Sequence, residues 1–384
     1  MLAKAETNSV ATTVDRWLAQ FERALAERDD VLLETLFHAD SHWRDVLALT
    51  WGIRTVSGLD AIVKELRAHV GRARPAGFRT APQRTAPRHV TRAGTSAIEA
   101  IFQFETADGR GSGVLQLTPD ENHGTALKAR TLLTSLDELS GATDHAGRPR
   151  SYSEGPPLDD CDLITTSILL SLARKSHILL TEQAKSLDST LLDALERVGF
   201  KLDFGEDGTG WQFKYLTRGG GYYFNVGCSD LIVEGEIGLV QFSDIAGFVS
   251  EGASMRTGDT LAADLIVLAT GYKGLEHQVS GLFGDDVAAR VGPIWGFGDD
   301  QELRNMFVRT GQPGLWFIAG SFAQCRIYSK YLGLQIKACE AGLLPGSARF
   351  WTPRARAARF EPKRTRTRIK MTSMSVGVGC REGG

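Results

Sequence analysis

The apolar positions at the start of the chain recur at helical spacing. Between residues 12 and 28 they fall on one face, which predicts an amphipathic helix. These positions are Val14, Trp17, Leu18, Phe21 and Leu25. Shorter apolar repeats predict a second helix over residues 32–37 and a third over residues 59–70. The chain is therefore expected to begin with three helices.

After an Arg- and Pro-rich turn region at residues 71–88, the pattern changes to partial alternation of apolar and polar residues. The alternation covers residues 89–104, 113–117 and 127–136, with polar turns between them. A period of two is typical of strands that bury one face. Helices followed by long antiparallel strands predict an α+β domain over residues 1–140, with the helices laid on a curved antiparallel sheet.

A polar stretch rich in Gly and Pro separates this domain from the rest of the chain. Residues 141–157 include Gly141, Gly147, Pro149 and the run Gly155-Pro156-Pro157. This composition is typical of a linker, so we place a domain boundary here. A second domain is expected over residues 158–345, where helical patterns are followed by short strands, including strands within residues 232–242.

The second domain contains two apolar runs without polar alternation, at residues 265–268 and 314–319. Unbroken apolar strands are typical of the centre of a parallel sheet, where both faces are buried. Ligands lie at the carboxyl ends of such strands, and small residues there let a cofactor approach the backbone. The residues that follow the runs are Ala269, Thr270, Gly271 and Tyr272 in the first and Gly320 and Ser321 in the second. For the first run alone, a plain buried strand that ends in a glycine turn is the alternative.

Composition narrows the class of protein. The length of 384 residues suffices for two or three domains, and the formal net charge of −2 argues against a nucleic-acid-binding protein. The five cysteines are odd in number and form no C-x-x-C pair, which indicates neither a disulfide framework nor a zinc site. No signal core and no membrane-spanning stretch is predicted, so we expect a cytoplasmic protein.

The last segment, residues 346–384, differs in charge from the rest of the chain. It is rich in Arg and Lys and loses the apolar periodicity, which predicts a disordered tail. A frameshift or an altered terminus would explain this change. The alternative is a contact with nucleic acid or acidic lipid.

Several features of residues 1–140 occur in a recognisable order. They are the opening amphipathic helix, the Leu36-Phe37-x-x-Asp40 step, Trp43-Arg44-Asp45, the helix start at Gly58 and the closing strands. This order resembles the nuclear-transport-factor-like (SnoaL-like) cone fold. The resemblance implies a cone whose mouth holds a small apolar ligand, and some members of the family use an Asp or His there as a general base. In multidomain relatives such cones also serve assembly, which predicts a homodimer through this domain.

The resemblance singles out Asp45 as the catalytic residue by its position. The expected pocket is lined by Trp43, Trp51 and Phe102, and a carboxylate between aromatic rings could have a raised pKa suited to proton transfer. The alternative is that Asp45 caps a turn through hydrogen bonds.

Motifs of residues 154–345 follow a second recognisable order. They are WQFKYLTRGGGYYFNVGCSDLI at 211–232, ATGY at 269–272, FIAGS at 317–321 and QIKACEAG at 335–342. Together they resemble the C-terminal part of flavin-containing monooxygenases, which use FAD and NADPH to insert one oxygen atom from O₂ into a substrate. The resemblance implies an oxidoreductase that acts on a small organic substrate. It places Ala269, Thr270, Gly271 and Tyr272 near the flavin or the NADPH entrance, and Gly320 and Ser321 near the ribityl chain of the flavin.

The cofactor-binding loops of that family are missing from this sequence. The family needs two G-x-G-x-x-G loops, each between a strand and a helix, and an F-x-G-x-x-x-H motif between them, and none of the three occurs here. The chain reads as if the middle of a parent protein had been excised near residues 150–154. We therefore expect weak FAD binding or none. Two other hypotheses stay open: the cone domain alone binds a small ligand or acts in an isomerase-like way, or the chain is an inactive truncated product.

Overall fold

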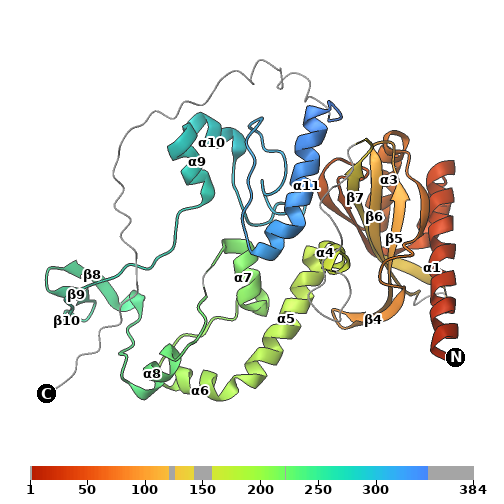
Figure 1. Ribbon diagram of the computed structural model, residues 1–384. Coiled ribbons are helices and arrows are strands. Elements are labelled where there is room, and N and C mark those ends of the chain that lie inside the picture. Colours follow the sequence, from red (N-terminus) through yellow and green to blue (C-terminus); the bar gives the residue numbers. More distant parts are fainter. Residues whose placement is uncertain (1, 121–125, 142–157, 221, 345–384) are drawn as a thin grey trace.

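The computed structural model describes residues 2–120, 126–141, 158–220 and 222–344. The described residues up to 141 form a cone, and those from 158 onward form a second part beside it (Figure 1). The helices of the cone are α1 (Leu2–Glu27), α2 (Asp30–Leu36) and α3 (Leu59–Ala73). Its strands are β1 (Phe37–Val46), β2 (Ile53–Ser57), β3 (Ala76–Thr80), β4 (Arg88–Arg92), β5 (Thr95–Glu105), β6 (Gly109–Pro119) and β7 (Leu127–Leu139).

The strands of the cone form one sheet in the order β2-β1-β7-β6-β5-β3, and β4 also pairs with β5. Neighbouring strands run antiparallel except β1 and β7, which run parallel. The predicted α+β cone is thus confirmed, but the expected purely antiparallel sheet is wrong at this pair. Parallel strands need a long connection between them. Here the connection is the chain between β1 and β7, which contains α3 and the other strands of the sheet.

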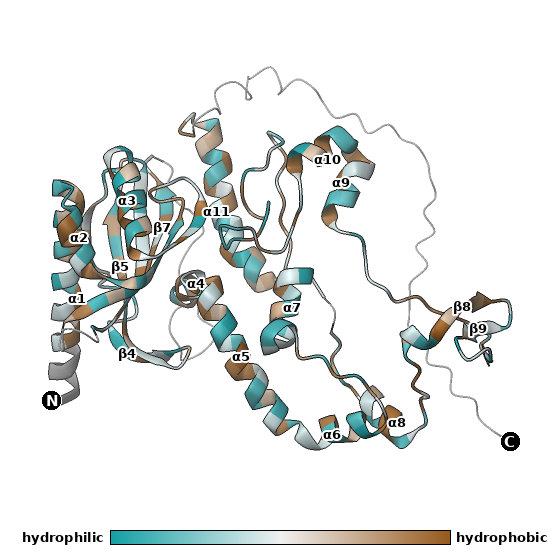
Figure 2. Ribbon diagram, turned by 180° about the vertical axis from the view of Figure 1, so that it is seen from behind, coloured by the Kyte–Doolittle hydropathy of each residue, from teal (hydrophilic) through white to brown (hydrophobic). Residues whose placement is uncertain are grey.

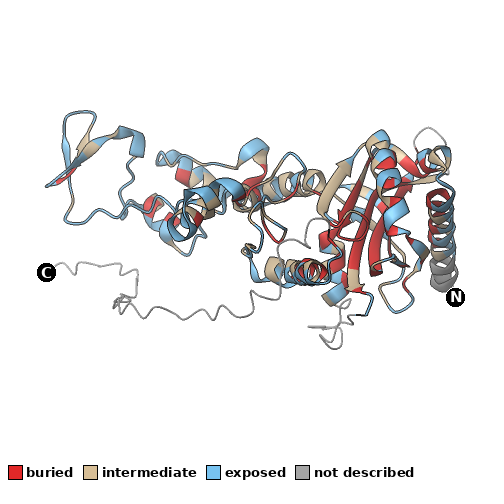
Figure 3. Cartoon of the chain, turned by 90° about the horizontal axis from the view of Figure 1, so that it is seen from above, coloured by how far each residue is buried: buried red, intermediate tan, exposed pale blue. Residues whose placement is uncertain are grey.

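Aromatic side chains fill the space between the sheet and its helices. Trp17 and Phe21 of α1 contact Phe37, and Phe78 of β3 stacks on Phe104 of β5, with ring centroids 5.0 to 6.0 Å apart. Each such pair contributes about 0.5–1.5 kcal/mol beyond the burial of its area. Figure 3 shows the buried strands of this core in red. The interior of the cone is therefore packed with side chains.

Strand β6 accommodates these rings with a glycine. A Cβ atom on Gly113 would lie 2.2 Å from the ring of Phe102 and 2.2 Å from the carbonyl oxygen of Leu133. Glycine leaves the room that the ring needs, so the close packing of β5 on β6 depends on this residue.

Two helices of the second part cover the outer face of the same sheet. They are α4 (Leu158–Thr166), which contacts β6, and α11 (Phe322–Glu340), which contacts β7. Ser135 of β7 donates a hydrogen bond to the hydroxyl of Tyr331 (2.9 Å), and Asp137 pairs with Lys330 (2.7 Å). The apolar core continues through Leu163, Ile327 and Ala338. A homodimer through this area of the cone would have to displace both helices.

The rest of the second part consists of short helices, one small sheet and long connections (Figure 1). Its helices are α5 (Leu170–Leu187), α6 (Ser189–Arg197), α7 (Gly210–Arg218), α8 (Cys228–Glu234), α9 (Leu275–Phe283) and α10 (Asp285–Val291). Its strands β8 (Ile245–Val249), β9 (Gly252–Met255) and β10 (Thr260–Ala262) form an antiparallel sheet. A small apolar core surrounds Val279, Val291 and Phe307.

Two predictions for the second part are wrong. Residues 265–268 and 314–319 form no strand, and among the described residues after 157 there is no parallel sheet. A central strand needs partner strands on both sides to receive its backbone hydrogen bonds, and the described part of this chain provides none there. Residues 232–242, expected to form short strands, contain none. Residues 232–234 are the end of the helix α8, and Gly235 ends this helix in a left-handed conformation.

Apolar side chains of the second part are consequently exposed. The exposed fraction is 79 % for Leu265, 71 % for Val267 and 96 % for Phe322. Figure 2 shows apolar residues along thin connections of this part as well as on its helices. Exposed apolar surface of this kind promotes association.

Candidate ligand-binding site

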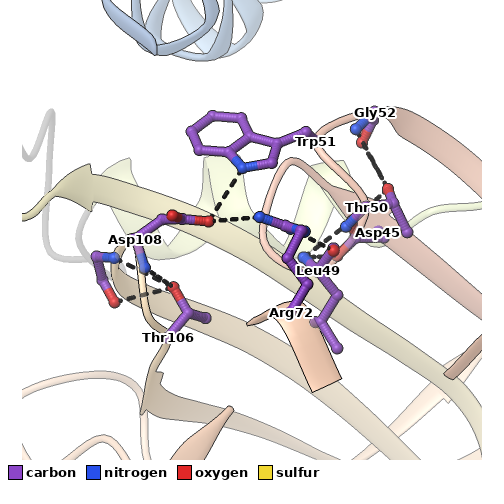
Figure 4. Close-up of polar contacts among 9 residues, drawn as sticks. Asp45, Leu49, Thr50, Trp51, Gly52, Arg72, Thr106 and Asp108 are labelled. Carbon is purple, nitrogen blue, oxygen red and sulfur yellow. Dashed lines mark hydrogen bonds and ion pairs between the residues drawn. The ribbon is translucent and has the colours of Figure 1, made fainter. Parts of the chain in front are cut away.

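Asp45, the predicted catalytic residue, lies on β1 with no exposed surface. Its carboxylate accepts hydrogen bonds from the backbone N–H groups of Leu49 and Thr50 (2.8 Å for Thr50) and from the Thr50 hydroxyl (2.7 Å; Figure 4). It also accepts a hydrogen bond from the hydroxyl of Thr134 (2.6 Å). Burial raises the pKa of Asp45, while these hydrogen bonds act in the opposite direction. The side chain therefore caps the turn at residues 47–52, and its catalytic role stays a prediction.

Polar contacts link the same turn to α3 and to the loop between β5 and β6. Arg72 of α3 donates to the carbonyl oxygen of Leu49 (2.6 Å) and pairs with Asp108 (2.7 Å), which also accepts from the indole of Trp51 (3.0 Å; Figure 4). Trp43 and Phe102 have no exposed surface, and Trp51 is buried. The predicted aromatic neighbours of Asp45 thus belong to the packed core, and a ligand could reach the carboxylate only if the turn opened.

The predicted flavin-binding residues lie in exposed backbone. Ala269, Thr270, Gly271 and Tyr272 belong to the long connection between β10 and α9, and all four are exposed (Figure 1). Gly320 and Ser321 are exposed as well, and the Ser321 hydroxyl caps α11 by accepting from the backbone N–H of Gln324 (3.2 Å). These residues do not form the edge of a parallel sheet, so they do not fit a dinucleotide, and the FAD and NADPH predictions stay untested.

A cavity of about 600 Å³ lies between the outer face of the cone and the second part. We call it the junction cavity. Arg44, Ile53 and Thr55 form its cone wall, the start of α5 forms another, and residues 297–308 with Tyr328 of α11 complete it. Its volume is typical of a small-molecule site, for which about 300–1,000 Å³ is usual.

A buried ion pair joins the two parts beside this cavity. Arg44 donates through Nε to Oε1 of Glu302 (2.9 Å) and through Nη2 to Oε2 (2.6 Å), and Thr55 donates its hydroxyl to Oε1 (2.8 Å). Arg44 also donates to the carbonyl oxygen of Thr166 and to the hydroxyl of Tyr328 (3.3 Å). Burial alone would lower the pKa of Arg44, but the charge of Glu302 raises it, so the guanidinium stays ionised.

The loop that supplies Glu302 contains several non-glycine residues in left-handed conformations. Their φ angles are 74° at Trp295, 63° at Gln301, 56° at Asn305 and 58° at Phe307. Side chains hold these conformations in place: the amide of Asn305 donates to the carbonyls of Val291 and Pro293, both at 2.8 Å. Such conformations are costly and cluster at binding and active sites.

No pattern in the sequence indicates that Arg44 and Glu302 form a pair. Arg44 is the polar neighbour of Asp45 in the motif Trp43-Arg44-Asp45, and strand alternation would have placed the two side chains on opposite faces. Glu302 lies 258 positions away, in a loop without apolar periodicity. Only packing of α4 and α11 on the cone brings the two residues together.

The described residues contain no group of three or more His, Cys, Asp or Glu side chains that could hold a metal ion. None of the helices among these residues is by itself long and apolar enough to cross a membrane. The helices α4 and α5, bent by 104° relative to each other, are long and apolar enough only when taken together.

Known proteins are similar to this chain in three-dimensional structure only. No family model matches the sequence, and no curated protein matches it. The chain is similar to a nuclear transport factor 2-like superfamily protein from Salmonella enterica, with 13 % identity over 38 % of this chain and 99 % of that one, and a TM-score of 0.26. A protein with a cystatin-like fold from Nostoc punctiforme has 13 % identity over 33 % and 90 %, with a TM-score of 0.25. A steroid delta-isomerase from Pseudomonas aeruginosa has 17 % identity over 34 % and 82 %, with a TM-score of 0.22.

Proposed function

We propose that this chain binds a small organic molecule in the junction cavity. The observation that carries the proposal is a cavity of about 600 Å³ bounded by a strained loop and by the buried pair Arg44 and Glu302. The pair fixes the cone wall of the cavity to the loop that carries Glu302, because separating the two buried charges would cost a large amount of free energy. Such a preorganised wall lowers the cost of ordering a site when the ligand enters.

The lining of the cavity favours a ligand with an apolar body and one polar group. Ile53, Leu169 and Phe297 supply apolar surface, while the hydroxyl of Tyr328 and the exposed guanidinium of Arg304 supply hydrogen-bond donors. Two donors of this kind suit a carboxylate or a carbonyl oxygen. A small carboxylic acid with one or two rings is the ligand class that fits this lining.

The structure offers less support for a monooxygenase than for a ligand-binding protein. The apolar run 265–268, expected beside the flavin, is exposed, and the run 314–319 packs partly on the small apolar core of the second part without forming a strand. No step of the proposed function involves FAD or NADPH. The chain is still proposed to bind a small ligand, but the site lies on the outer face of the cone rather than in its packed interior. An isomerase-like reaction at Asp45 stays a prediction that requires the turn at residues 47–52 to open.

Ligand-observed NMR with a set of one- and two-ring carboxylic acids tests the proposal. Ala173 lines the junction cavity, so Ala173→Trp should fill it and abolish the signals of the acids that bind. Leu192→Trp is the matched control, because Leu192 lines a different cavity and the same side chain is introduced there. Acids that bind equally well to Ala173→Trp, or a set in which none binds the unmodified chain, would refute the proposal.

A further inference from the structure

A second cavity, of about 460 Å³, lies within the second part between α5, α6 and the start of α7. We call it the α5–α7 cavity. One wall consists of leucines from α5 and α6, which are Leu180, Leu191, Leu192 and Leu195. Aromatic residues from the following segments also line the cavity, which are Phe200, Phe204, Trp211, Tyr222 and Tyr223. A lining of leucines and aromatic rings is suited to a flat ring.

Two of the three lysines that line this cavity are paired within the chain. Lys214 pairs with Asp203, and Lys185 pairs with Glu182 (3.0 Å) while its ammonium lies 4.7 Å above the ring of Phe204. Lys201 and Asp188 also line the cavity, and these two exposed side chains are opposite in charge. A charged ligand would have to compete with these pairs, which favours a neutral one.

A histidine with one unpaired ring nitrogen among the described residues also lines this cavity. His177 of α5 packs edge-on against Phe213, with ring centroids 5.8 Å apart, and its Nδ1 is buried without a hydrogen-bond partner among the described residues. Burial lowers the pKa of His177, so the ring is neutral near neutral pH. A neutral imidazole has one donor and one acceptor nitrogen, and polar groups in such surroundings are normally satisfied.

We propose that the α5–α7 cavity is a second binding site, for a compact neutral aromatic molecule with one hydroxyl or N–H group that hydrogen-bonds to the imidazole of His177. The aromatic and leucine walls hold the ring of the ligand, and the imidazole selects its polar group. This site shares no lining residue with the junction cavity and is independent of the function proposed there.

Titration of the full chain with p-cresol, p-xylene and 4-methylcyclohexanol, followed by ligand-observed NMR, tests the proposal. p-Xylene lacks the hydroxyl of p-cresol, and 4-methylcyclohexanol lacks its aromatic ring. We expect p-cresol to bind at least about fivefold more tightly than either analogue, because one hydrogen bond or one aromatic contact contributes about that factor. Equal affinities for all three compounds would overturn the ligand class.

Variants then locate the site. Leu192→Trp should abolish p-cresol binding, while Ala173→Trp, in the junction cavity, should leave it unchanged. His177→Leu should remove the preference for p-cresol over p-xylene, and His177→Gln, which keeps a hydrogen-bonding group, should restore part of it. His277→Leu, at an exposed histidine of α9, is the matched control. Binding of p-cresol that survives Leu192→Trp, or a preference that survives in His177→Leu, would overturn the proposal.

Discussion

Apolar residues that were expected to form strands have different structures in the cone and in the second part. In the cone, Phe102 and Leu132 lie on strands between other strands and are 0 % and 1 % exposed. In the second part, the equally apolar residues 265–268 lie in a connection, with exposed fractions from 38 % to 79 %. An apolar run predicts a buried strand only where other strands can take its hydrogen bonds.

The comparison extends to polar groups. The buried charge of Arg44 is matched by Glu302 and by neighbouring oxygens, whereas His177 in the second part leaves a buried nitrogen without a partner. The cone is not free of such atoms, because Asp30 Oδ1 and Thr131 Oγ1 are also buried without a hydrogen-bond partner. Only His177 among these residues lines a cavity described above, where a ligand or water can supply the missing partner.

The largest expected effect compares two phenylalanines. Phe102→Ala should lower the free energy of unfolding by about 3–5 kcal/mol, because it leaves a cavity in a closed core. Phe322→Ala, at a residue that is 96 % exposed, should change it by less than about 0.5 kcal/mol. Chemical denaturation followed by circular dichroism measures both, and similar losses at the two positions would contradict the contrast between the regions.

The second effect concerns the ion pair that joins the regions. Arg44→Met should cost about 3–5 kcal/mol, because it leaves the carboxylate of Glu302 buried without its cation. The double variant Arg44→Met with Glu302→Leu should regain most of this loss. Both would be measured by the same denaturation experiment.

An exposed ion pair is the control for this measurement. Arg67 pairs with Asp30 at 2.5 Å, and the Arg67 side chain is 62 % exposed. Arg67→Met should therefore cost less than about 1 kcal/mol. If Arg44→Met cost no more than Arg67→Met, the two parts would not be packed as described, and the junction cavity would lose its wall.

The smallest effect is a pH dependence at the same junction. His42 of β1 contacts the hydroxyl of Ser57 (2.7 Å). Burial lowers the pKa of His42 below the ordinary 6.5. The charge of Asp40 opposes this shift, whereas the charges of Arg130 and Lys175 add to it. The unfolded chain then binds a proton more readily than the folded one. Stability from His42 is thus fully present above pH 6.5 and is lost as the pH falls through the lowered pKa.

His42→Gln should flatten the loss of stability below pH 6.5. His277→Gln, at an exposed histidine, serves as the control and should leave the slope as it is. Unfolding midpoints measured from pH 7.5 down to pH 5.5 (an interval of about one unit on each side) check this prediction. A slope that is unchanged in His42→Gln would show that the ring is not shielded between β1 and α5.

Much of the cone follows from local sequence patterns. The helical spacing of Trp17, Phe21 and Leu25 predicts α1, and the alternation in residues 127–136 predicts β7, because one buried face dictates the period of the residues. Residues 89–104 were expected to be one stretch of strand, but they form β4 and β5, divided by a turn at residues 93–94. In the second part the same reasoning failed at the apolar runs. It misassigned residues 265–268, because a run of apolar residues does not tell whether partner strands exist.

The sequence by itself determined the helices of the cone and its strands after residue 88, the turn at Asp45 as an alternative to catalysis, and the absence of glycine-rich dinucleotide loops. It did not indicate β1, β2 or β3, the last of which lies in the region expected to form turns. Only the tertiary structure decided that β1 and β7 run parallel, that α4 and α11 cover the outer face of the sheet, and that Arg44 meets Glu302. Local patterns reflect one face of one element, whereas a cavity is bounded by several elements at once. The physical reason is that burial and charge pairing depend on neighbours that the chain brings together from hundreds of residues apart.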